Sequence, residues 1–312
     1  MADPLAATFR RPFPEQVAAF RLRLGDLVPT ARWDDLWQDA HDRAFMVAGA
    51  TKADLLADLA EAVDKAISQG TSLEQFRADF RRIVEKNGWH GWTGEDTEAG
   101  QAWRTRVIYR TNARTTYAAG RHAQLVEGGF KYWVYRHGGS LEPRIQHLGW
   151  DGMILEADHP FWQTHYPPNG WGCSCYVIGA RSIEGAKRRG GDPSIEPGDW
   201  QKLDPKTGAP EGIDKGWAYA PGRSVVEEVR AAMAAKVTKL PDALGAAAAN
   251  VTPPPRPVKF ADLESAIEQL LKTRPIDEAR ARIERMIARL PEGERETGRA
   301  ILEAALEKVR RA

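Results

Sequence analysis

The stretch from Arg144 to Ile178 constrains this chain more than any other segment, because its most specialised side chains are concentrated there. Both cysteines of the protein, Cys173 and Cys175, lie in it. Three of its seven histidines lie there as well, namely His147, His159 and His165. Such a concentration indicates either a site built from these side chains or a tightly fixed loop, and the remaining segments have to fold around it.

Composition and charge limit the kinds of partner and compartment that this protein can have. The chain has 312 residues, of which 42% are hydrophobic and 28% charged, as is ordinary for a globular protein. A formal net charge of +1 gives no global attraction to DNA or to a membrane, so local patches must supply any such attraction. No apolar run approaches the ~18 residues that span a bilayer, and the N-terminus lacks the pattern of a signal peptide. We therefore expect no membrane partner. Two cysteines argue against a disulfide framework and for a reducing compartment of synthesis.

Helical periodicity dominates the chain before the central stretch. The spacing of apolar residues, together with glycine stops and capping patterns, predicts a helical body. The predicted helices cover residues 14–25, 31–48, 51–70, 71–88 and 95–125. The second of these is expected because Trp33, Leu36 and Trp37 begin an apolar row at three-to-four spacing.

Three short segments have strand character. Residues 130–136 alternate and are aromatic or β-branched, and residues 152–156 and 175–178 are further candidates. The expected fold class is α+β, with a helix-rich N-terminal body packed on a small antiparallel sheet. A long loop, a Pro-rich linker and a C-terminal helical tail follow. The predicted divisions are 1–30 (arm and short helix), 31–180 (main domain), 181–240 (Gly/Pro-rich loop and helix), 241–259 (Ala/Pro linker) and 260–312 (helical tail).

Zinc is the first chemistry to consider for the central stretch. Structural zinc takes four cysteine or histidine ligands. Cys173 and Cys175 flank one residue, and His147 and His165 are the candidate partners, with Asp151 or Asp158 able to complete the set. The alternative without metal is two buried thiols at the start of a strand, with the histidines hydrogen bonded.

Other chemistries remain open from the residues alone. A disulfide between the two cysteines would close a very small, strained ring. A cysteine could act as a nucleophile with His147 or His165 as its base. A metal nuclease could use His147, Asp151, His159 and His165, although no paired carboxylates support it.

Arginines and prolines outside the cysteine pair also suggest roles. Arg106, Arg110 and Arg114 are spaced by four and share a face of the predicted helix, with Arg121 further along. The row is either a solvated face or a contact strip for DNA phosphates or an acidic partner. Pro167 and Pro168, followed by glycines, are expected to fix the position of Trp171 and the cysteines. Arg144 could lock this loop by pairing with Asp151 or Asp158.

These residues together resemble the phage Mu protein F-like minor head proteins, also called phage head morphogenesis proteins. The resemblance covers roughly residues 30–180 and includes the helix that carries Arg110 and Arg114. Its matching positions are Arg144, His147, Gly149 or Gly152, Asp158 with Phe161 and Trp162, Pro167, Pro168, Cys173 and Cys175. Many relatives have a His just before the first cysteine and an Arg between the two. This chain has Trp171-Gly172 and Ser174 there.

The resemblance implies a structural protein of a tailed phage or prophage, with no catalytic turnover. It implies a place in the virion near the portal vertex, after assembly in the bacterial host cytoplasm. The implied partners are the portal protein, the major capsid protein and double-stranded DNA, and the implied role is head assembly and DNA packaging or delivery. The alternative is a metal-dependent nucleic-acid-processing enzyme that uses His147, His165, Cys173 and Cys175.

Overall fold

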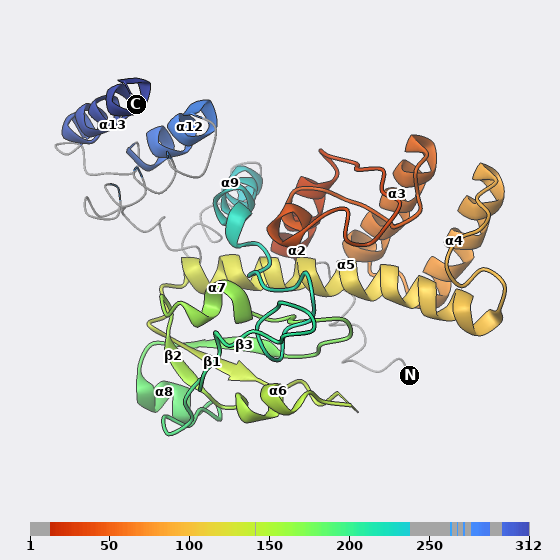
Figure 1. The fold of residues 1–312 in the computed structure, drawn as a ribbon, viewed down its shortest axis with the longest axis horizontal. Coiled ribbons are helices and arrows are strands. Elements are labelled where there is room, and N and C mark those ends of the chain that lie inside the picture. The colour runs from red at the N-terminus through yellow and green to blue at the C-terminus, as the bar shows by residue number, and fades with distance from the viewer. Residues whose placement is uncertain are drawn as a thin grey trace. The chain divides into compact units, whose positions relative to one another are not determined.

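The computed structural model of the protein describes most of the chain (Figure 1). The described residues are 13–140, 142–237, 263, 267, 271, 276–287 and 295–311. The chain forms two compact units, Met1–Val251 and Thr252–Ala312. The predicted linker 241–259 lies outside the described residues.

The first unit begins with four of the expected helices. They are α2 (Pro14–Arg23), α3 (Ala53–Gln69), α4 (Leu73–Asn87) and α5 (Glu98–Glu127). Gly70 and Gly88 end α3 and α4 in the left-handed conformation that glycine adopts easily. Ser72 and Thr97 cap the starts of α4 and α5 by accepting backbone hydrogen bonds. These helix predictions are confirmed, with ends shifted by a few residues.

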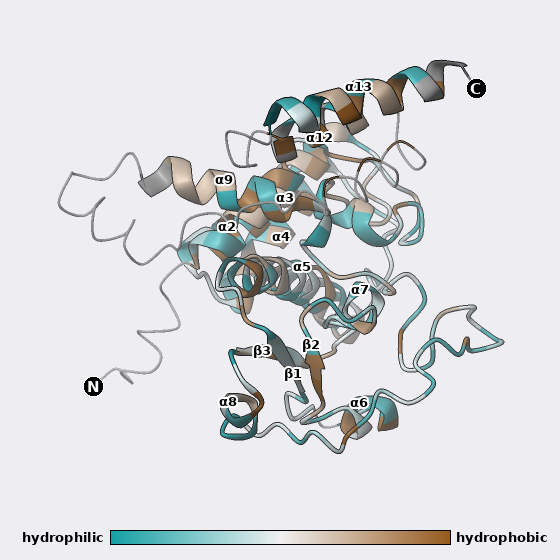
Figure 2. Ribbon diagram, turned by 90° about the vertical axis from the view of Figure 1, so that its left-hand side faces the viewer, coloured by the Kyte–Doolittle hydropathy of each residue, from teal (hydrophilic) through white to brown (hydrophobic). Residues whose placement is uncertain are grey.

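Helix α5 has 30 residues and separates two layers of this unit. Figure 2 views it nearly end-on, with α2, α3 and α4 on one side and three strands on the other. On the helical side, Phe20, Phe45, Leu56 and Phe80 share one apolar core. Gly120 allows α2 and α5 to approach closely, since a Cβ there would lie 2.8 Å from the backbone nitrogen of Gln16.

The predicted helix over residues 31–48 is wrong. The segment contains only a short 3₁₀ helix, η1 (Gln38–Asp42), and Gln38 at its start has φ of 48°. The Asp35 carboxylate accepts the backbone N–H groups of Ala31 and Arg32, which gives this backbone a local alternative to a helix. The spacing of the tryptophans therefore reflects a surface cluster and not the buried stripe of a helix.

Three strands form an antiparallel sheet in the order β2-β1-β3, which confirms the α+β prediction. They are β1 (Tyr132–Arg136), β2 (Ile154–Glu156) and β3 (Tyr176–Ala180). One face carries Trp133, Tyr135 and Val177 into a core with Leu125 of α5. That core also includes residues of α7 (Phe161–His165). The opposite face packs Val134 and Ala180 on α8 (Ile183–Lys187).

The segment after the sheet belongs to the same compact unit. Residues 188–222 are described throughout and form loops without a named helix or strand. The buried Asp42 carboxylate accepts hydrogen bonds from Gly222 N and Ser224 Oγ. Helix η2 (Arg223–Val225) then contacts η1 and α5, and α9 (Val226–Val237) packs against α2 and α5. The predicted divisions at residues 31 and 181 therefore do not separate compact units.

The second unit contains α12 (Ile276–Ile287) and α13 (Arg295–Arg311). Their apolar faces enclose a small core with Leu263 and Ile267. Arg280 joins the two helices by a 2.7 Å ion pair with Glu303. Among the described helices of the chain, none combines the length and the apolar character needed to cross a bilayer.

Candidate metal site

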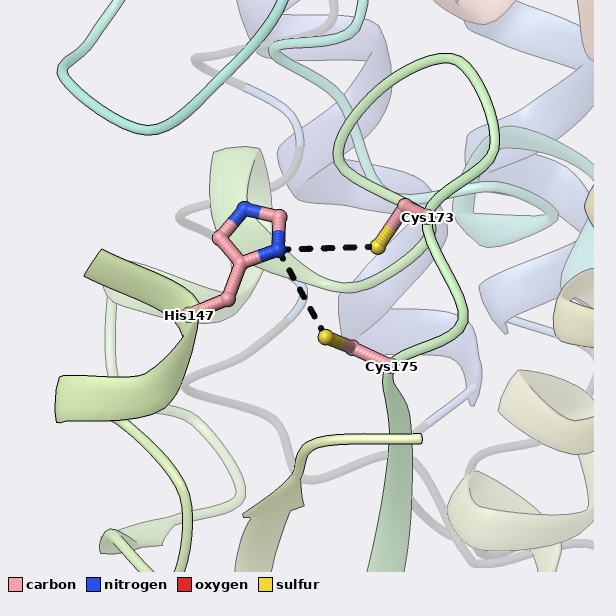
Figure 3. A group of neighbouring side chains, drawn as sticks. All are labelled: His147, Cys173 and Cys175. Atoms are coloured by element: carbon pink, nitrogen blue, oxygen red, sulfur yellow. Dashed lines mark hydrogen bonds between the residues drawn. The ribbon is translucent and has the colours of Figure 1, made fainter. Parts of the chain in front are cut away.

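Three of the predicted side chains meet in the interior of the first unit (Figure 3). Nδ1 of His147 lies 3.5 Å from Sγ of Cys175 and 3.8 Å from Sγ of Cys173. All three residues are buried, and their ligand atoms lie within 4.8 Å of one another. Within the described part of the chain, no other cluster of histidine, cysteine and carboxylate side chains is this close. The site therefore brings together three of the four ligands predicted for zinc.

His147 is oriented by a backbone carbonyl from a distant loop. It lies in the short helix α6 (Ile145–Gly149), and its Nε2 is 2.8 Å from the carbonyl oxygen of Gly212. A carbonyl can only accept, so Nε2 carries the proton and the lone pair of neutral Nδ1 faces the sulfurs. Metal-binding histidines are commonly held in this way by their second nitrogen. Stacking on Trp150, with ring centroids 5.6 Å apart, further fixes the imidazole.

The cysteine loop is fixed from several sides. The Pro167-Pro168 peptide bond is cis, and Cys173 N donates to Gly170 O at 3.1 Å. The guanidinium of Arg114 on α5 donates to the carbonyl of Cys173. Cys175 directly precedes β3, so the sheet holds the second thiol. The two sulfurs are thus positioned by α5 and the sheet together.

The two thiols shift each other's pKa in opposite directions. The Cys175 thiol donates a hydrogen bond to Cys173, which holds the pKa of Cys173 well below its ordinary value despite burial. The pKa of Cys175 is raised, because its proton is held by Cys173 and its ionised form would be buried beside another thiolate. Of the two thiols, that of Cys173 therefore loses its proton more readily, and the thiolate is the form that binds a metal.

The three donor atoms fit zinc in their ligand type and in the hydrogen bonds that orient the ligand residues. Two sulfurs and one imidazole nitrogen suit a tetrahedral site, which takes one further ligand. Asn169 is fully buried, and its Oδ1 has no hydrogen-bond partner. Its Nδ2 donates to the hydroxyl of Tyr135, a group that also hydrogen bonds to Cys175. A buried, unpartnered oxygen on a residue whose backbone also hydrogen bonds to Cys173 is a physical reason to expect an additional group nearby.

His165, the predicted fourth ligand, is not part of the cluster. Its Nδ1 is 2.7 Å from Thr164 Oγ1, and its ring stacks on Phe161 with centroids 4.5 Å apart. Asp151 does not join the sulfurs either, because its carboxylate binds Arg136 at 2.9 Å. His159 Nδ1 accepts the backbone N–H of Phe161 at the start of α7. The set His147, Asp151, His159 and His165 is therefore not gathered into one site.

The predicted partner of Arg144 is wrong. Its guanidinium binds Asp214 at 2.6 Å, and not Asp151 or Asp158. The same oxygen of Asp214 accepts the backbone N–H of Trp171 at 2.8 Å. Asp214 thus joins the start of the central stretch to the cysteine loop. Sequence reasoning missed Asp214 and Gly212, which lie in a loop without periodicity and far along the chain.

Replacing Asp214 with Ala is expected to lower the free energy of unfolding of the first unit by about 2–4 kcal/mol, because it removes two charged hydrogen bonds at a partly buried position. Urea unfolding followed by tryptophan fluorescence measures this. All eleven tryptophans precede residue 252, so the signal reports the first unit.

Glu211→Ala is the matched control for that prediction. Glu211 lies in the same loop and pairs with Lys202 at 2.7 Å, but on a more exposed surface. Exposed pairs contribute about 0–1 kcal/mol, so the control is expected to change little. Equal effects of the two substitutions would contradict a special role for Asp214.

The predicted arginine row lies on α5 as expected, but its members differ in exposure and in their hydrogen-bond partners. Arg106 and Arg110 are exposed. Arg114 binds the Cys173 carbonyl, and Arg121 binds Gln124. A role for these four side chains in DNA or partner contact stays a prediction.

Comparisons with known proteins agree with the sequence motifs. Residues 57–178 match the family model described as Phage Mu protein F like protein. The chain is 36% identical over 195 residues to "Putative capsid assembly protein F" of Escherichia phage Mu, covering 59% of this chain and 43% of the relative. It is 39% identical over 154 residues to "Mu-like prophage FluMu F protein" of Haemophilus influenzae, covering 47% of this chain and 37% of the relative.

The chain thus spans less than half the length of these curated relatives. No solved structure matches it significantly. The family match includes α5, β1, β2, the first three residues of β3 and the whole His147, Cys173 and Cys175 cluster. Residues 57–178 of this chain therefore form a Mu protein F-like region, and two relatives are more than a third identical to the chain over 195 and 154 residues.

Proposed function

We propose that this protein acts in phage head morphogenesis as a minor capsid protein without catalytic turnover. The observation that carries the proposal is the 36% identity over 195 residues to a phage Mu protein named for capsid assembly. The finer part of the proposal is a position at the portal vertex, with the portal and major capsid proteins as partners and a contribution to DNA packaging or delivery.

The geometry of the central stretch supports a structural role. His147, Cys173 and Cys175 are all buried, as side chains that stabilise a fold commonly are. Arg114, Arg144 and Asp214 fix the surrounding loops by hydrogen bonds and an ion pair. Side chains used in this way make the local structure rigid. A rigid structure suits a protein that assembles into a particle.

The experiment that tests this function uses the phage or prophage genome that encodes the chain. An in-frame deletion of residues 57–178 is expected to abolish DNA-filled heads, and the full chain supplied in trans is expected to restore them. Electron microscopy counts the heads. Immunogold labelling of purified heads at a single vertex would support the portal position. Normal heads without the segment would overturn the proposal.

We further propose that His147, Cys173 and Cys175 hold a structural zinc ion. The support is the closeness of the three ligand atoms, the lone pair of Nδ1 aimed at the sulfurs and the unpartnered oxygen of Asn169. Bound zinc would cross-link α6 to the start of β3. The residues of this chain supply the orientation, since Gly212 fixes the imidazole and Arg114 fixes the loop.

A further inference from the structure

One face of α5 carries two arginines that have no partner within the described part of the chain. Trp103, Arg106, Arg110 and Arg114 are three or four residues apart and therefore share a face. Arg106 and Arg110 are exposed, and among the described residues neither has an ion-pair or hydrogen-bond partner. Most other arginines on this unit's surface pair with a carboxylate or a carbonyl. These two are available to an external group.

A hollow of about 210 Å³ lies along this face of α5. Its far wall is the loop at residues 168–172 together with Trp217. The side chains that matter for binding are Trp103, Arg106, Arg110, Arg114, Trp171 and Trp217, and no carboxylate lines the hollow. Its volume suits one large apolar side chain, and its charge suits an anionic neighbour of that side chain.

The aromatic wall of the hollow is held in place while still partly open to solvent. Trp103 and Trp171 are each 42% exposed. Trp171 packs edge-on against Trp217 at 5.2 Å and against Trp33 at 6.1 Å, and its backbone N–H is bound by Asp214. A wall fixed before binding lowers the entropy lost on association. Exposed tryptophan beside arginine is also the composition of the residues that dominate protein interfaces.

We propose that this hollow, which we call the α5 hollow, docks an acidic segment of a protein partner. An apolar side chain of the segment enters between Trp103 and Trp171, and its flanking carboxylates bind Arg106 and Arg110. The two arginines are one helical turn apart, about 6 Å along the axis. Carboxylates two residues apart on an extended segment, or four apart on a helix, have a similar spacing of about 6–7 Å.

Nucleic acid fits the same surface less well. Single strands bind where successive bases stack on open aromatic faces. Trp171 meets Trp217 and Trp33 edge to face, at 78° and 82°, so these rings do not offer parallel faces on which successive bases could stack. A duplex would place phosphates near the arginines but would leave the apolar hollow empty. The arginine row therefore favours an acidic protein segment over DNA.

Docking at the α5 hollow goes beyond the proposed role in head assembly and needs only the purified chain. The probe is a fluorescein-labelled peptide of alternating glutamate and leucine, titrated with the full protein and followed by fluorescence anisotropy. Reversing both charges, Arg106→Glu with Arg110→Glu, is expected to weaken binding by roughly tenfold or more. Trp103→Ala is expected to weaken it similarly while leaving the circular dichroism spectrum unchanged.

The matched control reverses two exposed arginines outside the hollow, Arg81→Glu with Arg188→Glu. It changes the net charge equally and is expected to shift Kd by less than about twofold. Equal binding by the Arg106/Arg110 variant and the wild type, or no binding by the wild type, would overturn the proposal. Tighter binding of an oligothymidylate that displaces the peptide would overturn it in favour of nucleic acid. None of these outcomes bears on head assembly, which the deletion measures separately.

Discussion

Purified wild-type protein is expected to contain about one zinc ion per chain, and Cys175→Ser is expected to lose most of it. Serine keeps the size of the side chain but replaces a soft sulfur ligand with an oxygen that is rarely ionised. Because a bound ion stabilises only the folded state, losing it should also lower the free energy of unfolding. For a site filled at a thousand times its Kd, this loss is about 4 kcal/mol.

Elemental analysis by mass spectrometry measures the metal, and urea unfolding followed by tryptophan fluorescence measures the stability. Ser174→Ala is the matched control, because it lies between the cysteines and leaves both sulfurs in place. It is expected to keep the metal. A metal-free wild type, or a Cys175→Ser variant with full metal content, would contradict the zinc proposal.

The same measurement separates the two histidines that the sequence offered as ligands. His147→Gln is expected to abolish metal binding, because Nδ1 of His147 faces both sulfurs. His165→Gln is expected to retain it, because His165 is engaged by Thr164 and Phe161 instead. Sequence spacing treated the two as equivalent. Only the folded positions of α6 and α7 distinguish them.

Periodicity allowed the helices and the sheet to be predicted from the sequence. Apolar stripes and glycine stops located α3 and α4, and alternation located β1, because these patterns depend on neighbours a few residues away. The same rule failed over residues 31–48. There Trp33 and Trp37 follow helical spacing but contribute to an exposed aromatic cluster, and Asp35 binds the local backbone instead.

The candidate site could be predicted only in part. The Cys-Ser-Cys segment and His147 stood out because cysteine and histidine are rare in this chain. The groups that orient these three side chains did not stand out in the sequence. The Gly212 carbonyl is a backbone atom that no motif marks, and Asp214 is one of many acids in a loop without periodicity. These contacts span more than sixty residues of sequence, so they depend on how the later loop returns to α6.

A second large effect is expected on acidification, through His122 on α5. Its ring is buried edge-on against Trp133 at 5.6 Å and against Tyr166 at 5.1 Å. Burial, with a smaller effect of the Arg223 charge, lowers the pKa of His122 from 6.5 to about 3. In the unfolded chain the imidazole takes up a proton near pH 6.5. Between these values the unfolded state therefore binds more protons than the folded state.

The stabilisation from neutral His122 is thus fully present above pH 6.5 and is lost as the pH falls toward 3. The loss is about 1.4 kcal/mol per pH unit, or roughly 2–3 kcal/mol by pH 4.5. His122→Phe keeps an aromatic ring in the same place and has no proton to gain. The free energy of unfolding of the variant minus that of the wild type is therefore expected to be larger at pH 4.5 than at pH 7, by that amount. Urea unfolding at several pH values measures the difference.

Asp42 acts in the opposite direction and provides the internal check. Burial raises the pKa of Asp42 from 3.8 to about 6, so its contribution to stability is present below pH 3.8 and is lost as the pH rises through 6. Asp42→Asn should therefore make the loss of stability on acidification steeper, whereas His122→Phe should make it shallower. Because the two groups have opposite effects, the dependence of stability on pH tests whether His122 and Asp42 are buried. Parallel profiles for the wild type and both variants would show that neither group has the buried environment described here.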